Sequence, residues 1–312
     1  MITRLYYRIK PLIPRRVQIE MRRIMVQRKC VRCADVWPID ERACKTPKGW
    51  RGWPEGKKFA LVLTHDVDTA RGQEKCRELM NLEMKLGFRS SFNFVPRRYD
   101  VSIELREELV RKGFEVGIHG LYHDGKKYHS REIFRERARQ INEYIKEWEC
   151  TGFRSPSMQH NLDWIHDLEI EYDASTFDTD PFEPQSDGMC TIFPFWVQAK
   201  AKRGGYVELP YTLAQDFTLF VLMKENNIGI WKRKLDWIAE KSGMALLNTH
   251  PDYMNFGEKK LDLEEYPAKH YEEFLGYIKS KGRDQYWNVH PQNIARFWRE
   301  NYLNITNGSS NI

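Results

Sequence analysis

Short apolar runs and longer amphipathic stretches alternate along most of the chain. The apolar run 59–64 precedes a stretch with helical spacing, 73–86, that closes at Gly87, and the run 90–95 precedes a second such stretch, 103–112. Short apolar runs bounded by turn residues are typical of buried strands, and a glycine after an amphipathic stretch is typical of a helix end. Repeated strand–helix units predict a mainly parallel sheet, either closed as a barrel or open.

The same alternation continues towards the C-terminus, which extends the predicted α/β domain over most of the chain. Further strands are predicted at 114–118, 152–154, 172–176, 191–197, 206–213 and 244–249. Further helices are predicted at 131–148, 232–241, 271–281 and 291–301. The resulting division is an N-terminal extension with an irregular lead-in over 1–58, a catalytic domain over 59–303 and a loose polar tail over 304–312.

Length and composition fit a cytosolic protein with a large core. With 312 residues, 41% of them hydrophobic and 30% charged, the chain suits one barrel-like α/β domain with an added segment. No apolar run approaches the roughly eighteen residues that a membrane-spanning helix needs. Arg4, Arg8 and Lys10 interrupt the start before a secretory signal could form, and six scattered cysteines make no disulfide framework. We therefore expect a cytoplasmic location.

Positive charge is concentrated at the N-terminus. Residues 1–32 hold ten basic side chains and one acidic side chain, Glu20, so this segment carries +9 while the whole chain carries +6. The rest of the chain is therefore slightly acidic, and it shows no basic stripe with interleaved aromatic residues. We expect no nucleic-acid partner.

The basic segment 1–33 also contains regularly interspersed apolar residues, which leaves two interpretations. It could lie on an anionic membrane surface, where each basic residue adds about 1 kcal/mol of binding. It could instead be an arm that packs on its own domain or on a partner subunit. The sequence does not decide between these uses, and it leaves the oligomeric state open.

Two carboxylates follow the first predicted strand. In Thr64-His65-Asp66-Val67-Asp68, Asp66 and Asp68 stand at a strand end, separated by one residue. Side chains at alternate positions of a strand end can converge on one site and take different roles there. An Asp-x-Asp at a strand end is, however, more often a turn or a helix cap than a catalytic site.

Two histidines, His119 and His123, follow the third predicted strand. Their spacing suits a single metal ion, because one helix-like turn brings residues i and i+4 to the same side. Two hydrogen-bonded histidines in a loop are the alternative. The glycines Gly117 and Gly120 indicate tight backbone geometry rather than core packing.

Three further polar residues follow later strands. Arg154 comes just after a short strand and is followed by Pro156, which suits an arginine that holds a carboxylate through a two-pronged contact. Asp180 ends an aspartate-rich stretch that begins at Tyr172. His250 ends the last apolar strand, where a capping or core histidine would be the default interpretation.

Taken in order, these motifs resemble the polysaccharide deacetylase (NodB-like) family. That family has an acidic motif at a strand end, a His-x3-His, an Arg-x-Pro, an aspartate after a short strand and a late histidine at a strand end. All five occur here, over about residues 59–252, some three fifths of the chain. The resemblance implies a distorted (β/α) barrel with fewer than eight regular units.

The resemblance also implies a cofactor. Asp68, His119 and His123 match the family's ligands for one divalent metal ion, with positions left for water and substrate. Zinc is the expected ion, and cobalt, nickel, iron and manganese are alternatives because this ligand set accepts them.

Five other positions take roles from the family by the same comparison. Asp66 matches the catalytic base, Arg154 the residue that orients it, and His250 the catalytic acid. Asp180 matches the aspartate that tunes that acid. The backbone amide near Ser157 matches a group that holds the oxyanion.

The chain also departs from the family pattern. Val67 separates aspartates that are usually adjacent. Asn248 stands where a leucine is common, Pro181 and Phe182 follow the fourth motif where a tryptophan is common, and Ser157 replaces an aromatic residue. These positions usually wall the acyl pocket, so a more polar wall leaves room for formyl or another acyl group beside acetyl.

The function predicted from these observations is metal-dependent hydrolysis of an N-acyl amide on a sugar. A nucleotide- or lipid-linked intermediate of surface polysaccharide synthesis, met at the inner face of a membrane, is the predicted form of that sugar. One alternative is hydrolysis of a non-sugar carbon–nitrogen bond, such as that of a cyclic ureide. The other is a non-catalytic carbohydrate-binding relative that kept the fold.

Overall fold

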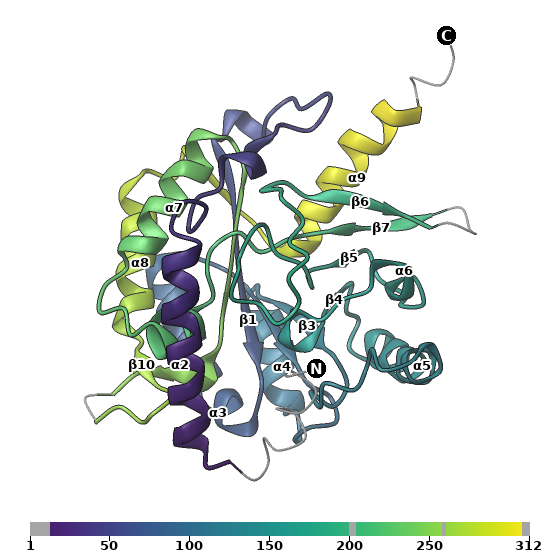
Figure 1. Ribbon diagram of the computed structural model, residues 1–312. Helices are drawn as coiled ribbons and strands as arrows, with labels where there is room; N and C mark the ends of the chain where they lie inside the picture. The colour runs from purple at the N-terminus through teal and green to yellow at the C-terminus, as the bar shows by residue number, and fades with distance from the viewer. Residues whose placement is uncertain (1–12, 200–203, 258–259, 308–312) are drawn as a thin grey trace.

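A curled sheet of nine strands forms the centre of the molecule in a computed structural model, which describes residues 13–199, 204–257 and 260–307 (Figure 1). Eight strands follow one another in the order β11 (Tyr286–Asn288), β1 (Phe59–Val67), β2 (Ser91–Phe94), β3 (Glu115–His119), β4 (Gly152–Arg154), β5 (Tyr172–Asp173), β7 (Gly205–Glu208) and β6 (Phe195–Gln198). The ninth, β8 (Met244–Thr249), pairs with β1. All pairs are parallel except β6 with β7.

The curl of the sheet brings its two ends towards each other. β1 pairs with β8 along one edge and with β2 and β11 along the other. After β7 the chain makes single bridges from Tyr211 to Phe177 and from Leu213 to Leu247 of β8, so the segment beyond β7 lies against β8. The predicted distorted (β/α) barrel is confirmed.

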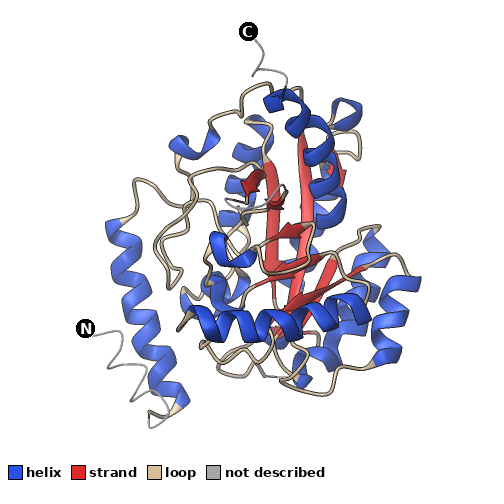
Figure 2. Cartoon of the chain, turned by 90° about the vertical axis from the view of Figure 1, so that its right-hand side faces the viewer, coloured by secondary structure: helices blue, strands red, loops and turns tan. Residues whose placement is uncertain are grey.

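Helices cover the outside of this sheet (Figure 2). They are α3 (Ala70–Leu86), α4 (Ile103–Arg111), α5 (Arg131–Glu147), the short α6 (Leu162–Ile165), α7 (Gly229–Glu240), α8 (Lys269–Ser280) and α9 (Pro291–Asn307). As predicted, α3 ends at Gly87, whose φ of 85° is the left-handed conformation that glycine adopts at helix ends. Short pieces near the site are a π-helical turn (Phe217–Leu222), 3₁₀ turns at Pro156–Met158 and Pro251–Tyr253, and the strand pair β9 (Met254–Asn255) and β10 (Tyr266–Pro267).

Boundaries differ from the prediction mainly in the second half of the chain. The strand predicted at 206–213 is regular only over Gly205–Glu208, and the strand predicted at 191–197 lies at Phe195–Gln198. The π-helical turn and β11 were not predicted. Helix α9 continues to Asn307, so the boundary of the predicted polar tail at residue 304 falls within a helix.

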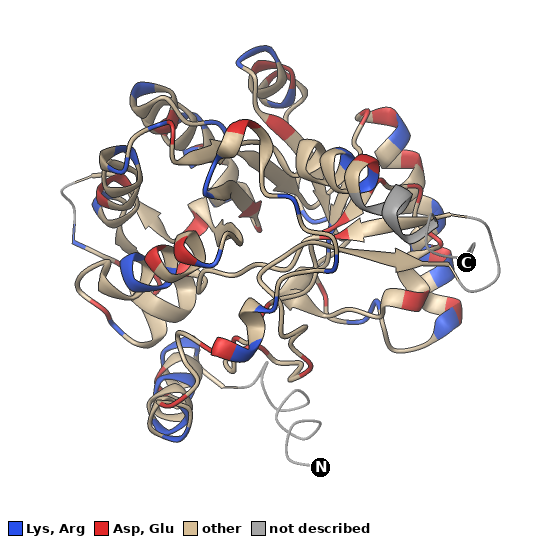
Figure 3. Cartoon of the chain, turned by 90° about the horizontal axis from the view of Figure 1, so that it is seen from above, with Lys and Arg blue, Asp and Glu red and all other residues tan. Residues whose placement is uncertain are grey.

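The N-terminal helix α2 (Arg15–Arg32) packs against its own domain. Ile19 and Val26 are buried, and the nearly buried Arg23 donates from Nε to the carbonyl oxygen of Val221 at 3.0 Å. Of the two interpretations of the basic segment, packing on the domain therefore holds for α2, while residues 1–12 lie outside the described part. Figure 3, which looks along α2, shows basic residues around it. In the described residues, no helix combines the length and apolar character needed to cross a membrane.

Candidate active site

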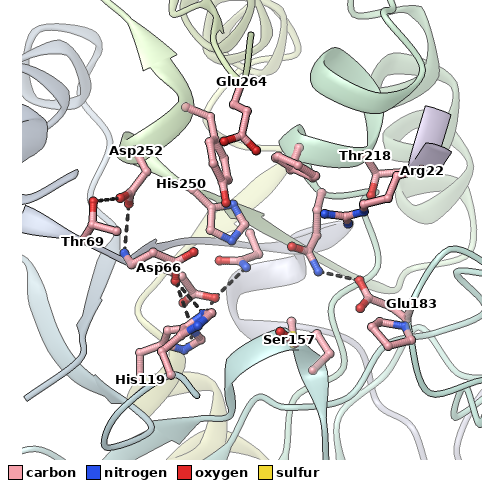
Figure 4. A pocket seen from close by; sticks show the side chains of 18 of the residues that line it. Arg22, Asp66, Thr69, His119, Ser157, Glu183, Thr218, His250, Asp252 and Glu264 are labelled. Carbon is pink, nitrogen blue, oxygen red and sulfur yellow. Dashed lines mark hydrogen bonds and ion pairs between the residues drawn. The ribbon is translucent and has the colours of Figure 1, made fainter. Parts of the chain in front are cut away.

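A pocket of about 620 Å³ opens at the carboxyl ends of the central strands (Figure 4). Asp66 is the next-to-last residue of β1, His119 ends β3 and His250 directly follows β8, so parallel strands of one sheet bring these side chains to the same edge. In parallel α/β sheets this edge is where ligands bind, because the strands end there and the loops leave room. Of the nine predicted site residues, seven line this pocket: Asp66, Asp68, His119, His123, Ser157, Asn248 and His250.

Asp68, His119 and His123 form a compact cluster of donor atoms. One donor atom of each residue lies within 4.8 Å of the others. Asp68 Oδ1 is 3.4 Å from His119 Nε2 and 3.0 Å from His123 Nε2. The same Oδ1 is buried and accepts no hydrogen bond from the described residues. A buried, unsatisfied carboxylate oxygen facing two imidazole nitrogens is the arrangement expected of a divalent-metal site.

The loop between the two histidines needs unusual backbone geometry. Gly120 has a φ of 67°, and a Cβ on this residue would lie 2.6 Å from Pro156 Cδ. His123 has a φ of 55°, which is uncommon for a residue other than glycine. Left-handed, non-glycine residues of this kind often occur at functional sites, where surrounding contacts hold them. Here the conformation points His123 back towards Asp68.

Asp66 is held mainly by two asparagines. Asn93 donates to its Oδ1 at 3.0 Å, and Asn248 donates to its Oδ2 at 2.8 Å. Burial alone would raise the pKa of Asp66, but the neighbouring His119 and Arg154 outweigh burial and lower the pKa. Asp66 is therefore a carboxylate near neutrality, as a proton acceptor must be.

Arg154 lies behind Asp66 rather than clasping it. Its Nη1 is 3.6 Å from Asp66 Oδ1, beyond a hydrogen bond, and donates instead to Thr64 Oγ1 at 2.8 Å. Its Nε donates to the carbonyl oxygen of Ala174 at 3.0 Å. The two-pronged contact expected from the sequence is thus corrected to a buried positive charge next to Asp66. Direct hydrogen bonding to Asp66 falls to Asn248 and Asn93.

His250 is paired with Asp216. The histidine Nδ1 lies 2.7 Å from Asp216 Oδ1, and the His250 amide donates to Asp216 Oδ2 at 2.8 Å. Tyr266 donates its hydroxyl to the same Oδ2. Burial would lower the pKa of His250, but the adjacent Asp216 carboxylate overcomes this and raises it to about 10. His250 is therefore a protonated imidazole at neutral pH and can donate a proton.

The role expected of Asp180 is corrected by this contact. Asp180 Oδ1 accepts a hydrogen bond from the Phe182 amide, and the residue lies near Asp178 and Tyr211 rather than against His250. Burial raises the pKa of Asp180 to about 6. The chain has placed the partner of His250 on a different segment, just after the bridge from Leu213 to β8.

Three functional residues were missed by sequence reasoning: Asn93, Asp216 and Asp252. Asp252 accepts hydrogen bonds from the Asp68 amide at 2.9 Å and from Thr69 Oγ1, so it fixes the turn that carries Asp68. Asn93 could have been found, since it lies in a predicted strand next to the Asp-x-Asp strand. Asp216 had no such signal, because the segment around it follows no regular pattern.

The pocket thus combines a metal-type ligand cluster, an ionised carboxylate and a protonated histidine at one edge of a half-barrel, an arrangement found in metal-dependent hydrolases. No family model and no curated protein sequence matches the chain. Its structure does have clear counterparts.

A protein from Mycobacterium smegmatis described as a polysaccharide deacetylase has a TM-score of 0.64 and 19% identity, with 82% of this chain and 95% of that one covered. A second protein described as a polysaccharide deacetylase, from Pseudomonas aeruginosa PAO1, has a TM-score of 0.60 and 17% identity, with 80% and 94% covered. The PuuE allantoinase has a TM-score of 0.66 and 15% identity, with 85% and 98% covered. This chain therefore has the fold of the polysaccharide deacetylases.

Proposed function

We propose that this protein is a metal-dependent hydrolase that removes an N-acyl group, acetyl or formyl, from a sugar. The observation that carries the proposal is the grouping of Asp68, His119 and His123 beside a carboxylate, Asp66, and a protonated histidine, His250, in one pocket. Hydrolysis of an amide needs a proton acceptor for water and a proton donor for the departing amine. The pocket supplies both.

The metal fits the chemistry of the cluster. Two imidazoles and one carboxylate suit zinc first, and they also accept cobalt, nickel, iron or manganese. When bound, such an ion would polarise the amide carbonyl and acidify water. The residues of the chain would hold the ion through Asp68, His119 and His123.

Proton transfer is assigned to two residues with opposite charge states. Asp66, kept ionised and fixed in orientation by Asn93 and Asn248, accepts a proton from the attacking water. His250, kept protonated by Asp216, donates a proton to the leaving nitrogen. The amine then leaves neutral, which makes cleavage of the carbon–nitrogen bond feasible. We assign to the Ser157 amide, on a turn with a φ of 55° at the pocket wall, the stabilisation of the developing oxyanion.

A purified enzyme and a small substrate panel test this function. Metal content is measured by elemental analysis, and amine release is followed with N-acetyl sugars, N-formyl sugars and allantoin as a cyclic ureide. We expect one equivalent of divalent metal and turnover of an N-acyl sugar that Asp66→Asn abolishes. Turnover of allantoin alone would transfer the proposal to a non-sugar bond. Sugar binding without turnover, unchanged in Asp66→Asn, would instead identify a non-catalytic relative.

We also propose that the outer side of α2 contacts an anionic membrane at the inner face. The helix exposes an unusual number of large apolar side chains: Val17, Met21, Ile24, Met25 and Val31. Spacings of four and seven residues place them on one side of the helix. Exposed arginines at 16, 28 and 32 accompany them. A surface that combines apolar and basic side chains suits the headgroup region of anionic lipids.

Sedimentation with vesicles that contain phosphatidylglycerol tests this contact. The double change Ile24→Ser, Met25→Ser should reduce the bound fraction several-fold, because it removes two exposed apolar side chains. The matched control is Ile103→Ser, Val110→Ser, which removes two slightly more exposed apolar side chains from α4. Equal binding by both double variants would refute the assignment to α2.

A further inference from the structure

The N-terminal helix α2 forms one wall of the pocket, and this wall lies across from the strand ends. Arg22 of α2 and the neighbouring Phe217 and Thr218 of the π-helical turn line the same pocket as Asp66 and His119. Figure 4 shows the Arg22 side chain reaching into the pocket from the side across from Asp66 and His119. A segment outside the predicted catalytic domain therefore contributes a positive charge to the candidate active site.

Arg22 is held in a defined position. Its guanidinium carbon lies 4.7 Å from the centroid of the Phe217 ring, a cation–π contact. The next residue, Arg23, fixes the helix to the same turn through the carbonyl oxygen of Val221. A guanidinium stacked on a ring still presents its N–H donors at its edge, which is the geometry that recognises planar or tetrahedral oxyanions.

Two other arginines that line the pocket, Arg15 and Arg71, pair with carboxylates of the domain. Arg15 forms an ion pair with Glu264, and Arg71 contacts Asp262 and Glu265. These pairs join α2 and α3 to the segment before β10. The guanidinium of Arg22 stacks on an aromatic ring at the pocket wall.

Glu183, a carboxyl group that lines the same pocket, does not strongly repel a bound anion. Glu183 accepts hydrogen bonds from Tyr211 at 2.7 Å and from Gln215 at 2.6 Å. Burial and the charge of Asp180 raise the pKa of Glu183 to about 8. At neutral pH this side chain is therefore mostly uncharged, and it can hydrogen-bond a polar ligand without repelling a negative one.

We propose that Arg22 binds a phosphate or diphosphate group of the substrate while the acyl amide of its sugar lies between Asp66 and His250. This inference rests on the proposed function and specifies its substrate class as an N-acyl sugar that carries a phosphate ester. Arginine forms charge-assisted, often two-pronged hydrogen bonds to phosphate, whereas a neutral sugar offers it only hydroxyl groups. A nucleotide diphosphate and a lipid diphosphate would both supply this chemistry.

Binding of inorganic pyrophosphate to the metal-loaded protein tests the inference without turnover. In calorimetry, Arg22→Gln should weaken pyrophosphate binding about 10- to 100-fold, the usual effect of losing a charge-assisted contact. Arg22→Lys keeps the charge and should recover part of the affinity. Arg16→Gln, an equal loss of charge at an exposed position of α2 outside the pocket, is the control. Equal affinities of the Arg22→Gln and Arg16→Gln proteins, or no pyrophosphate binding by the parent, would overturn the proposal.

Turnover then separates the substrate classes. Arg22→Gln should raise the KM for uridine diphosphate N-acetylglucosamine, or for an isoprenyl diphosphate N-acetylglucosamine, about 10- to 100-fold. It should lower kcat/KM for the free sugar much less than kcat/KM for the phosphorylated sugar. The diphosphate that the parent prefers identifies the carrier, and an equal loss on free and phosphorylated sugars would overturn the proposal. If the parent hydrolyses none of these sugars, the proposed function fails while pyrophosphate binding still decides the role of Arg22.

Discussion

The two sides of the pocket are built in different ways. On one side, Asp66, His119 and His250 sit at the ends of paired parallel strands, and each is fixed by hydrogen bonds or by close packing. The opposite side consists of the helix α2 and the π-helical turn Phe217–Leu222, which come from irregular or added parts of the chain.

The difference assigns separate tasks to the two sides. Strand ends in a sheet cannot shift independently, which suits groups that must meet around a metal and a reacting bond. A helix added beside the sheet can change without disturbing the strands, which suits recognition of the part of a substrate that does not react. The pocket thus joins groups held by the sheet to a wall supplied by an added helix and an irregular turn.

The largest expected effect comes from the strand side. Asp68→Asn removes the negative charge and one ligand from the cluster, so we expect loss of bound metal and at least a 10³-fold loss of activity, about 4 kcal/mol or more in transition-state stabilisation. Elemental analysis and amine release measure the two effects. Asp35→Asn, at an exposed position, is the control. Full metal content in Asp68→Asn would show that the cluster does not hold the ion.

The next largest effect is expected on the stability of the added wall, the side of the pocket formed by α2 and the π-helical turn. Ile19 of α2 is fully buried on the side that faces the domain, whereas Ile24 of the same helix is about half exposed. Ile19→Ala should cost about 2–4 kcal/mol of packing, whereas Ile24→Ala should change stability by less than about 0.5 kcal/mol. Hydrogen exchange of the α2 amides measures the loss. If the two sides are independent, metal content stays unchanged in both variants; a fall in Ile19→Ala would show that they are coupled.

A smaller effect is expected from the partner of His250. The histidine acts as an acid only below its pKa, so activity should fall as pH rises through that value. Asp216→Asn removes the charge that raises the pKa of His250, so the alkaline limb should move to lower pH and kcat should fall about 10- to 100-fold at pH 8. A pH profile of kcat measures both.

Tyr266→Phe is the matched change for this test. It removes one hydrogen bond to Asp216 but keeps the carboxylate beside His250, so the alkaline limb should move less than in Asp216→Asn. An identical profile for Asp216→Asn and the parent would show that His250 is not the group that limits activity at high pH.

The strand side of the site could be predicted from the sequence because its residues follow regular apolar runs. Asp66, Asp68, His119 and His250 each stand at the end of such a run, and parallel strands bring their ends to one edge. That the cluster forms was therefore predictable from local pattern and fold class together. The identity of the ion is not fixed by these residues and stays a prediction.

The residues that the added wall contributes to the site could not be predicted in the same way. Asp216 follows a strand that loses regularity after Glu208, so nothing local marks it as the partner of His250, and the assignment of Asp180 failed for this reason. Likewise, the charge pattern of α2 does not distinguish one of its arginines from another. Only docking of the helix decides that Arg22 enters the pocket while Arg16 stays outside.

The smallest effect probes the packing that supports the metal ligand. A Cβ on Gly72 of α3 would lie 2.2 Å from Oδ2 of Asp252, the carboxyl group that accepts the Asp68 amide. Gly72→Ala should therefore destabilise the protein by about 1–2 kcal/mol through overpacking. Gly276→Ala in α8, with open space around the new methyl group, should stabilise by about 0.5–1 kcal/mol because alanine favours helix. Urea unfolding distinguishes the two signs. Stabilisation by both changes would show that α3 can move away from Asp252, and that the strand side is less rigid than its hydrogen bonds indicate.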